Sequence, residues 1–471
     1  MSRLIVVSNR VNAPIDSTAG TAGGLAMALA AALREYSGIW FGWSGATTEK
    51  FTGQISMQRV NGVTVALVDL EEQDRQEYYN GYANRTLWPL FHYRIDLAAY
   101  ERSFGEGYER VNKRFAETLR PLIEPGDLVW VHDYHLIPVA RHLRALGVEN
   151  RIGFFLHIPW PPRRLITTLP RHRQLVEALF AYDLVGFQTN DSREAFEDYI
   201  VKEAAGTVAP DGSAKAFNQG THVGAFPIGI DTQNFLSTAH SDGATEQYRR
   251  MQESLAGRKM VLGVDRLDYS KGLEERFLAY EQYLADNPQE RERVFMLQIA
   301  TESREEVPAY QELRARLDAV SGRINGAYAT VDWVPLRYVN RSYRRDQLAG
   351  IYRAAKVGLI TPLRDGMNLV AKEYVAAQDP DDPGVLVLSK FAGAAEQMKS
   401  ALIVNPFSRE DISDAIRRGL AMETEERIRR WQPLIADIKK QDVGAWRDSF
   451  VTTLKTVPIE EGVARGLRVT S

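Results

Sequence analysis

Residues 361–373 read TPLRDGMNLVAKE and join two contrasting segments of the chain. The apolar run before this stretch, residues 357–360, predicts a short buried strand, and residues 369–377 predict a helix. Between them, the Asp365–Gly366 pair permits a sharp turn, while Asn368 is suited to cap the helix. A strand, a tight loop and a helix in this order are typical of α/β folds.

The beginning of the expected helix has the chemistry of an anion site. A capped first turn leaves backbone amides at the positive end of the helix dipole, where a phosphate can bind. Asp365 precedes those amides, and Glu373, one turn into the helix, offers acceptor oxygens suited to paired sugar hydroxyls. Together these groups describe a site for a nucleotide-activated sugar. An ordinary capped strand–helix junction is the plainer alternative, which the spacing alone leaves equally open.

The composition predicts an ordinary globular protein of two or three domains. The chain has 471 residues, of which 44% are hydrophobic and 25% charged. A net charge of -3 argues against a dedicated nucleic-acid-binding protein. The absence of cysteine excludes disulfides, thiolate zinc sites and cysteine nucleophiles. No signal peptide or membrane span is recognisable, so we expect a cytoplasmic protein without a membrane partner.

Short strand-like runs alternate with helical patterns twice along the chain, which predicts two parallel sheets. The expected strands of the first series are residues 4–8, 38–43, 63–68, 127–131, 151–156, 184–187 and 223–228. Those of the second series are residues 259–264, 295–300, 357–360, 384–389 and 402–406. The polar segment 237–243 between the two series is expected to be a linker.

Polar residues follow two predicted strands of the first series, at the edge where α/β folds place their ligands. Asp133 follows strand 127–131 within the sequence His132-Asp133-Tyr134-His135, and His157 follows strand 151–156. The histidines could suggest a metal, but no third ligand has a supporting spacing. For His157, a buried core histidine and a functional one remain equally open.

Two further stretches of the first series are candidates for ligand binding. Residues 20–24 form a glycine-rich loop that lacks the Gly-x-Gly-x-x-Gly spacing, so a phosphate or sugar cradle is favoured over nicotinamide binding. A plain surface turn is the alternative. Residues 77–93 are dense in aromatic side chains, most of which we expect in the core, with one or two left to stack on a sugar.

The second series contains a cationic loop directly after its first strand. Arg266 and Lys271 lie in this loop beside an expected helix start, where they could hold a diphosphate and neutralise a leaving group. A solvated charged loop is the alternative. The acidic segment 379–382 resembles a metal-binding Asp-x-Asp pattern, but it follows no strand and is predicted to be a turn.

Five motifs, taken together and in order, resemble the trehalose-6-phosphate synthases of glycosyltransferase family 20. The motifs are Gly23-Gly24-Leu25, residues 130–135 (WVHDYH), residues 154–159 (FFLHIP), residues 266–272 (RLDYSKG) and residues 363–373 (LRDGMNLVAKE). The resemblance extends from residue 4 to about residue 455. It implies a GT-B fold, in which two Rossmann-like domains face each other across a deep cleft and a C-terminal helix crosses back to the first domain.

The resemblance implies an acceptor domain at residues 1–232, a donor domain at residues 233–455 and a tail at 456–471. In the acceptor site, Arg10 and Arg304 would grip the phosphate of glucose 6-phosphate, because guanidinium groups match a phosphate dianion. Tyr79 and Trp88 would assist them. Asp133 would contact the acceptor sugar near the reacting hydroxyl.

The resemblance also implies the donor site. The amide of Gly24, beside Gly23, would approach the donor phosphate, and Arg266 and Lys271 would clamp the diphosphate. Tyr343 would contact the uracil through its backbone, at a position where phenylalanine is usual. The remaining implied donor contacts lie in the stretch quoted first: Asp365, Leu369, Val370, Ala371, Lys372 and Glu373, the last of which would bind the ribose.

The implied reaction transfers glucose with retention from a nucleotide-glucose, UDP-glucose being favoured, to glucose 6-phosphate. The catalytic residues would be Asp365, which holds hydroxyls of the moving glucose, His157 near its C6 hydroxyl, and the clamp of Arg266 and Lys271. No cofactor or metal is implied, and the partners are the two small-molecule substrates and further copies of the chain, in a homo-oligomer such as a homotetramer. The alternatives are a cyclitol-joining pseudo-glycosyltransferase, a silent sugar-phosphate sensor and a hydrolase.

Overall fold

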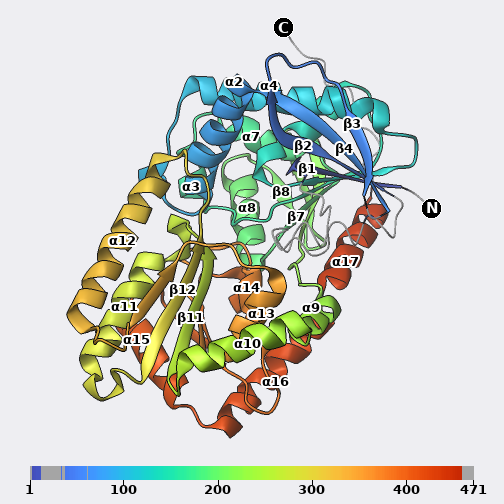
Figure 1. Ribbon diagram of the computed structural model, residues 1–471. Coiled ribbons are helices and arrows are strands. Elements are labelled where there is room, and N and C mark those ends of the chain that lie inside the picture. Colours follow the sequence, from blue (N-terminus) through green and yellow to red (C-terminus); the bar gives the residue numbers. More distant parts are fainter. Residues whose placement is uncertain (1–2, 12–32, 34–37, 61, 459–471) are drawn as a thin grey trace. The chain divides into compact units, whose positions relative to one another are not determined.

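The computed structural model describes residues 3–11, 33, 38–60 and 62–458 and shows two compact units (Figure 1). The first unit comprises the described residues up to Pro227 together with residues 446–458, and the second comprises residues 228–445. The expected division at residue 232 thus lies close to the start of the second unit. Each unit is an α/β fold built on one main sheet, which confirms the predicted class.

The sheet of the first unit has ten strands in the order β3-β4-β2-β1-β5-β6-β7-β10-β9-β8. Neighbouring strands from β4 to β10 are parallel, and hairpins add antiparallel strands at both edges. Val6 pairs with Trp40 on one side and Trp130 on the other, so the central strand is fully enclosed. The strands are β1 (Leu4–Arg10), β2 (Ile39–Thr48), β3 (Ser56–Val60), β4 (Val63–Glu71), β5 (Leu128–His132), β6 (Ile152–Phe155), β7 (Leu184–Phe187), β8 (Thr207–Val208), β9 (Ser213–Ala216) and β10 (Gln219–Ala225).

The strand order of the first sheet reverses beside β1, because β2 lies on one side of it and β5 on the other. At such a switch point the connecting loops diverge and leave room for a ligand at the carboxyl ends of the strands. Arg10 ends β1, Asp133 follows β5, and His157 comes two residues after β6. The topology therefore brings three predicted site residues to one edge of the sheet.

The aromatic stretch of the first unit forms a π-helix, η1 (Arg75–Leu87), a rare element that is common at functional sites. The fully buried carboxylate of Asp74 anchors its start by pairing with Arg110 and Arg114 of α4. The helices of this unit are α2 (Glu72–Asp74), η1, α3 (Trp88–Phe91), η2 (Ile95–Leu97), α4 (Arg102–Leu119), η3 (Arg120–Leu122), η4 (Tyr134–Leu136), α5 (Val139–Ala145), α6 (Arg163–Ile166), α7 (His172–Leu179) and α8 (Asn190–Lys202).

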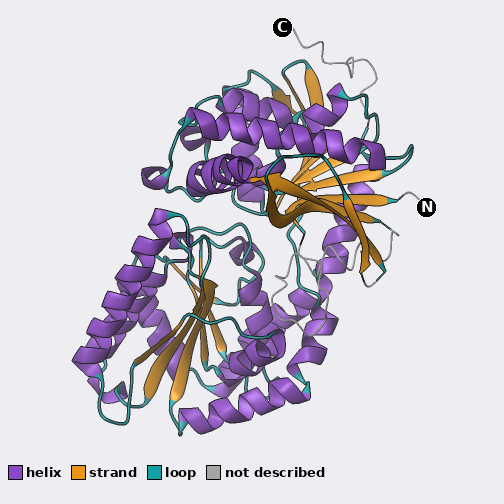
Figure 2. Cartoon of the chain, turned by 45° about the horizontal axis from the view of Figure 1, so that its top comes forward, coloured by secondary structure: helices purple, strands orange, loops and turns teal. Residues whose placement is uncertain are grey.

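The second unit is doubly wound: six parallel strands run in the order β13-β12-β11-β14-β15-β16, with helices on both faces (Figure 2). Its switch point lies between β11 and β14, where ligands of such sheets bind. Arg266 ends β11, and the stretch 361–373 follows β14. The strands are β11 (Lys259–Arg266), β12 (Val294–Thr301), β13 (Leu336–Val339), β14 (Val357–Ile360), β15 (Val385–Ser389) and β16 (Leu402–Val404).

The segment predicted as a linker is helical, so that prediction is wrong. Residues 237–239 end one helix and residues 242–243 begin the next, each capped by a side chain, Asp231 for the first and Ser241 for the second. The polar residues are the solvent faces of amphipathic helices. The helices of this unit are α9 (Thr232–Ala239), α10 (Asp242–Leu255), η5 (Tyr269–Lys271), α11 (Leu273–Asp286), η6 (Pro288–Glu290), α12 (Pro308–Tyr328), α13 (Arg345–Ala354), α14 (Leu369–Ala377), η7 (Gly393–Glu396), α15 (Arg409–Ala421) and α16 (Thr424–Lys440).

The last helix, α17 (Val443–Thr456), packs against the sheet of the first unit. The ring of Phe450 stacks on that of Trp130, with centroids 4.5 Å apart. Gly153 and Gly186 make room for it, since a Cβ atom at either position would lie within 2.8 Å of the Phe450 ring. Arg151 also donates to the carbonyl oxygens of Leu454 and Val457 at the end of the helix. None of the helices that the structure describes is both long and apolar enough to span a membrane.

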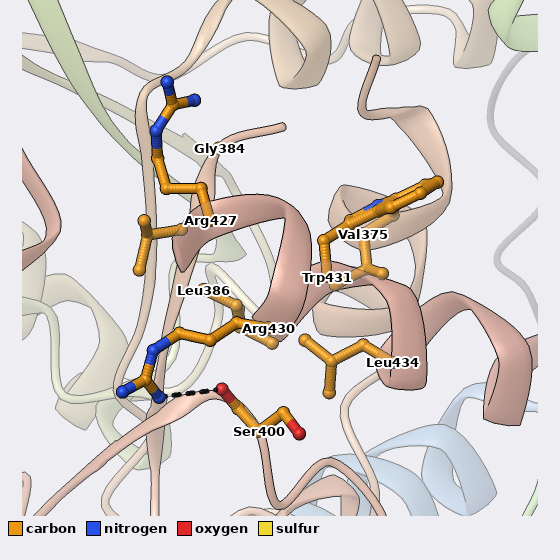
Figure 3. A pocket seen from close by; sticks show the side chains of 9 residues that line it. Val375, Gly384, Leu386, Ser400, Arg427, Arg430, Trp431 and Leu434 are labelled. Carbon is orange, nitrogen blue, oxygen red and sulfur yellow. Dashed lines mark hydrogen bonds between the residues drawn. The ribbon is translucent and has the colours of Figure 1, made fainter. Parts of the chain in front are cut away.

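A small cavity lies between α14, β15 and α16 (Figure 3). Arg430 reaches over it to the carbonyl oxygen of Ser400, at 3.2 Å, and Trp431 and Leu434 close it from the same helix. Its volume is about 10 Å³, which is room for one water molecule. We therefore regard it as a packing gap rather than a ligand site.

Candidate active site

The start of α14 is built as the sequence predicted. The side chain of Asn368 accepts a hydrogen bond from the Ala371 amide at 3.0 Å, which confirms it as the cap. Its other side-chain atom, Nδ2, donates to Asp365 Oδ2 at 3.1 Å. The amides of Leu369 and Val370 have no acceptor among the described residues, whereas the Ala371 amide is already engaged. Two donors at the positive end of the helix are thus available to an anion.

Lys271 lies beside this helix start and pairs with Asp365. Its ammonium is 2.6 Å from Asp365 Oδ2, and both side chains are largely buried, at 11% and 15% exposure. Gly272, at φ 64°, turns the chain directly after Lys271 so closely that a Cβ atom there would meet the carbonyl oxygen of Thr361 at 2.4 Å. The structure therefore brings Lys271 from the β11 loop and Asp365 from the β14 loop together at the switch point, with Arg266 exposed at the end of β11.

A buried arginine, Arg276 of α11, holds these two loops together. Its guanidinium pairs with Asp265 Oδ2 at 2.5 Å and donates to Gln298 Oε1 at 2.8 Å. It also donates to Thr361 Oγ1 at 3.1 Å and to the carbonyl oxygen of Lys271 at 3.2 Å. Arg276 is completely buried. Arg276 was not among the residues predicted from the sequence, where its one signal is a cation within the otherwise apolar face of α11.

Arg304, expected at the acceptor phosphate, is held by the loop after β11, through Asp268. Its guanidinium lies 3.3 Å from Asp268 Oδ2 and 2.5 Å from the hydroxyl of Tyr310, which itself donates to Asp268 at 3.1 Å. Asp268 also caps the short helix η5 through the Ser270 amide. Arg304 is thus positioned next to the segment that carries Lys271, in the second unit.

The other predicted donor contacts lie on or near α14. Burial raises the pKa of the Glu373 carboxyl, which accepts a long hydrogen bond of 3.5 Å from Tyr352. Burial also lowers the pKa of Lys372 to about 8, and its ammonium donates to the carbonyl oxygen of Ile228 and to Gln397. Protein groups already hold this ammonium, so a contact of Lys372 with the nucleotide-glucose stays a prediction. The backbone contact of Tyr343, in the loop before α13, with the uracil also stays a prediction.

Aromatic rings connect the predicted acceptor residues of the first unit. The Arg10 guanidinium lies over the Trp43 ring, 5.8 Å from its centroid, and Trp43 meets Tyr79 edge-on at 5.6 Å. Tyr79 stacks in turn on His135 at 6.0 Å. Trp88 reaches the same cluster through Tyr134, the neighbour of His135, with ring centroids 5.7 Å apart. Arg10, Tyr79 and Trp88 therefore belong to one continuous wall.

Asp133 and His157 meet beside this wall. Asp133 Oδ1 accepts a hydrogen bond from the His157 amide at 3.2 Å. The His157 ring is held on both sides: Gln188 Nε2 donates to Nδ1 at 3.4 Å, and Nε2 donates to His132 Nδ1 at 3.0 Å. The Gln188 amide nitrogen can only donate, so it sets the tautomer of His157, and His132 accepts the proton on Nε2. The metal alternative for His132 did not include this role.

Three of the residues at these two edges have strained backbones. Asp133 has φ 76° and ψ 164°, a backbone conformation that residues other than glycine rarely adopt. Asn368, at φ 93°, and Arg304, at φ 51°, also have positive φ. Each such residue costs about 1–3 kcal/mol, and strain of this kind concentrates at functional sites. The strain therefore supports both edges as functional.

Both buried histidines are neutral at physiological pH. Burial lowers the pKa of His157 to about 3, and it lowers the pKa of His132 well below the ordinary value, with a smaller contribution from His157. Within the described ranges, no group of three or more His, Asp or Glu side chains is arranged to hold a metal ion. The predicted residues Gly23 and Gly24 lie outside the described residues.

The His132–His157 pair predicts a loss of stability in acid. Because the folded-state pKa values lie below the unfolded value near 6.5, the unfolded chain binds protons first as the pH falls. We expect the free energy of unfolding to decrease from about pH 6.5 towards pH 3, by up to about 1.4 kcal/mol per pH unit for each histidine. Urea midpoints measured at about pH 7 and pH 5 should therefore differ less for His157→Gln than for the wild type. The exposed His240 offers a control, since His240→Gln should keep the wild-type difference; equal pH dependence in all three proteins would contradict the prediction.

The comparison with known proteins agrees with this geometry. The model of glycosyltransferase family 20 matches residues 2–456. The chain belongs to this family. A trehalose-6-phosphate synthase of Sinorhizobium fredii is 49% identical over 456 residues, which cover 96% of this chain and 98% of that relative. This family membership confirms the resemblance from which the site residues were predicted.

Solved structures of the family share the fold over almost the whole chain. An α,α-trehalose-phosphate synthase (UDP-forming) from Burkholderia xenovorans, in complex with glucose 6-phosphate, is 48% identical with a TM-score of 0.93 and covers 96% of this chain and 100% of its own. An E. coli structure bound with UDP-2-fluoro glucose is 45% identical with a TM-score of 0.92 and covers 97% and 100%. The protein is therefore a family 20 glycosyltransferase with two Rossmann-like units.

Proposed function

We propose that this protein transfers glucose from UDP-glucose to glucose 6-phosphate with retention, forming α,α-trehalose 6-phosphate and UDP. Relatives named trehalose-6-phosphate synthase match nearly the whole chain. Solved structures of such relatives contain glucose 6-phosphate or an analogue of UDP-glucose. The observation in this structure that carries the proposal is the arrangement of Lys271, Asp365 and the two available amides of α14. It combines a diphosphate clamp with a carboxylate for the sugar that is transferred.

The clamp explains how the leaving group is stabilised. As the C1–O bond of the donor breaks, negative charge grows on the departing phosphate oxygen. The ammonium of Lys271, the exposed guanidinium of Arg266 and the amides of Leu369 and Val370 are all donors suited to that charge. Because these donors are held in place before the reaction, they need little rearrangement in the transition state.

The transfer needs no protein nucleophile. The glucose C1 becomes oxocarbenium-like, the O1 oxygen of glucose 6-phosphate bonds to it from the face that the phosphate leaves, and the departing oxygen takes the O1 proton. Asp365 is already paired with Lys271 and bonded to Asn368, which suits a carboxylate that holds sugar hydroxyls. His157, neutral and fixed by His132, would act by position near the C6 hydroxyl rather than by proton transfer.

The acceptor role of Arg304 gives a kinetic prediction. Arg304→Ala removes the forked donor for a phosphate, so we expect the KM for glucose 6-phosphate to rise by about 10- to 100-fold and the KM for UDP-glucose to change little. Steady-state kinetics with each substrate varied in turn measures both. Tyr310→Phe is the matched control, because it removes a hydroxyl that positions Arg304 while the guanidinium remains. A similar rise in both KM values for Arg304→Ala would contradict the acceptor role.

One incubation separates the proposed function from the three alternatives. The protein is mixed with UDP-glucose and glucose 6-phosphate in the presence of EDTA, and UDP and sugar products are followed by NMR. We expect equal amounts of UDP and an α,α-linked disaccharide phosphate. A silent sensor releases no UDP, a hydrolase releases free glucose, and a pseudo-glycosyltransferase forms no disaccharide. Loss of turnover in EDTA would contradict a metal-independent reaction.

The proposal extends to the setting of the reaction. Its partners are the two small-molecule substrates and other copies of this chain, in a homo-oligomer such as a homotetramer, and we propose a cytoplasmic location. UDP is favoured as the nucleotide because solved relatives are described as UDP-forming or contain a UDP-sugar analogue. Analytical ultracentrifugation of the full chain tests the oligomer directly.

A further inference from the structure

A cavity in the first unit lies apart from the predicted donor and acceptor residues. It has a volume of about 310 Å³ and opens between η1, the start of α4 and the start of α7. Pockets that bind small molecules begin at roughly this size, about 300 Å³. The side chains that give it its character are Tyr82, Tyr100, Tyr108, Arg102, Arg171 and Gln174.

Two strong donors on the wall of this cavity make no side-chain hydrogen bond or ion pair with the described residues. The hydroxyl of Tyr82 makes no hydrogen bond to any described residue, although its ring is packed 4.4 Å from that of Tyr108. The guanidinium of the exposed Arg171 likewise has no ion pair among the described residues. Burial raises the pKa of Tyr82, so its hydroxyl stays protonated and can donate. The cavity therefore presents a cation and a neutral donor to its contents.

The acidic residues of the lining are neutralised from outside the cavity. Glu109 pairs with Arg141 at 2.5 Å and with His142 at 3.4 Å, and its pKa lies below the ordinary value although burial opposes this. Glu101 pairs with Arg85 at 3.4 Å. Neither Arg141 nor Arg85 lines the cavity. Arg171 of the lining also attracts Glu109, as the smallest of the effects that lower this pKa, but it makes no ion pair with Glu109 and can therefore still bind an anionic ligand.

Of the two helices that begin at the cavity, α7 adds to this positive character. α4 and α7 each start without a side-chain cap and without an acidic residue in the first turn. Arginine occupies the start of both, Arg102 in α4 and Arg171 directly before α7. Helix starts normally carry acidic or capping residues. The start of α4 has the acidic Glu101 at its cap position, whereas the start of α7 has neither kind of residue, so only the dipole of α7 is left unmatched.

We propose that this cavity binds a small phosphate ester that carries a ring. The phosphate would accept from Arg171 and the Tyr82 hydroxyl, and the ring would lie against the tyrosine side chains. This site is separate from the proposed donor and acceptor residues, none of which lines the cavity. The inference therefore does not depend on the transferase activity.

Calorimetric titration of the full chain tests the site with two probes, phenyl phosphate and glucose 6-phosphate. We expect at least one of them to bind. Its affinity should fall about 10-fold or more in Arg171→Gln and about 3- to 10-fold in Tyr82→Phe. Arg173→Gln is the matched control, since Arg173 lies on the same helix but over the Phe217 ring, outside the cavity. It should leave the affinity unchanged.

The outcomes are distinct from those of the activity test. Glucose 6-phosphate is also the proposed acceptor, and its binding there should not respond to Arg171→Gln or Tyr82→Phe. The site is rejected if no binding of either probe depends on these two substitutions, or if phenol binds as well as phenyl phosphate. An equal effect of Arg173→Gln would also reject it, because general surface charge would then explain the binding. Both test variants keep the packing of the wall, and unchanged circular dichroism confirms that they fold.

Discussion

Replacing Lys271 with alanine is expected to lower kcat by about 100- to 1,000-fold, the usual effect of removing one donor from a charged transition state. Lys271 lies 2.6 Å from Asp365 and is largely buried, so neither water nor a neighbouring flexible side chain can take its place easily. The KM values should change less than kcat, because the interaction strengthens as the phosphate departs.

The strand that precedes the Lys271 loop supplies a matched control. Lys259 begins β11 and donates to the carbonyl oxygen of Leu420, at the edge of the sheet opposite the switch point. Lys259→Ala removes an identical side chain and should keep near-wild-type turnover. Steady-state UDP release measures both variants. If Lys271→Ala retained more than about a tenth of the wild-type kcat, Lys271 could not be part of the clamp.

The local signals around the clamp were sufficient to predict its backbone. The apolar run 357–360 forms β14, residues 369–377 form α14, and Asn368 caps the helix. These features depend on neighbours in the sequence, which is why composition and spacing reveal them. The turn at residues 379–382 was predictable for the same reason, and Asp379 does bond the Asp381 amide there.

The features that the sequence could not reveal depend on distant partners. The aromatic run that contains Tyr79 was predictable as largely buried, but its π-helical form was not, because the pairing of Asp74 with Arg110 and Arg114 sets its start. The positive φ of Asp133 is likewise imposed by contacts to β6, since its amide donates to the carbonyl oxygen of Phe155. The linker predicted at 237–243 failed because polarity marks the exposed face of a helix as readily as a loop.

Arg276 is the largest omission, and it gives the second major prediction. Its guanidinium bonds four groups from four segments, so Arg276→Met should leave the buried carboxylate of Asp265 without its cation. Removing one partner of a buried pair costs about 3–5 kcal/mol. We expect the free energy of unfolding of the second unit to fall by this amount, and kcat to fall as well, because Thr361 and the Lys271 carbonyl lose their common anchor. Urea unfolding and UDP release measure the two effects.

A second substitution separates stability from positioning. In the double variant Arg276→Met with Asp265→Asn, both charges of this buried pair are gone. The new amide at position 265 can donate to Gln298 Oε1, which in the wild type accepts from the same Arg276 nitrogen that bonds Asp265. We expect it to recover at least half of the lost stability while kcat stays low, since nothing replaces the bonds to Thr361 and Lys271. Arg323→Met is the surface control: its pair with Glu281 is exposed on the arginine side, and its loss should change stability by less than about 1 kcal/mol. Recovery of kcat together with stability would show that Arg276 acts only through folding and does not position the clamp.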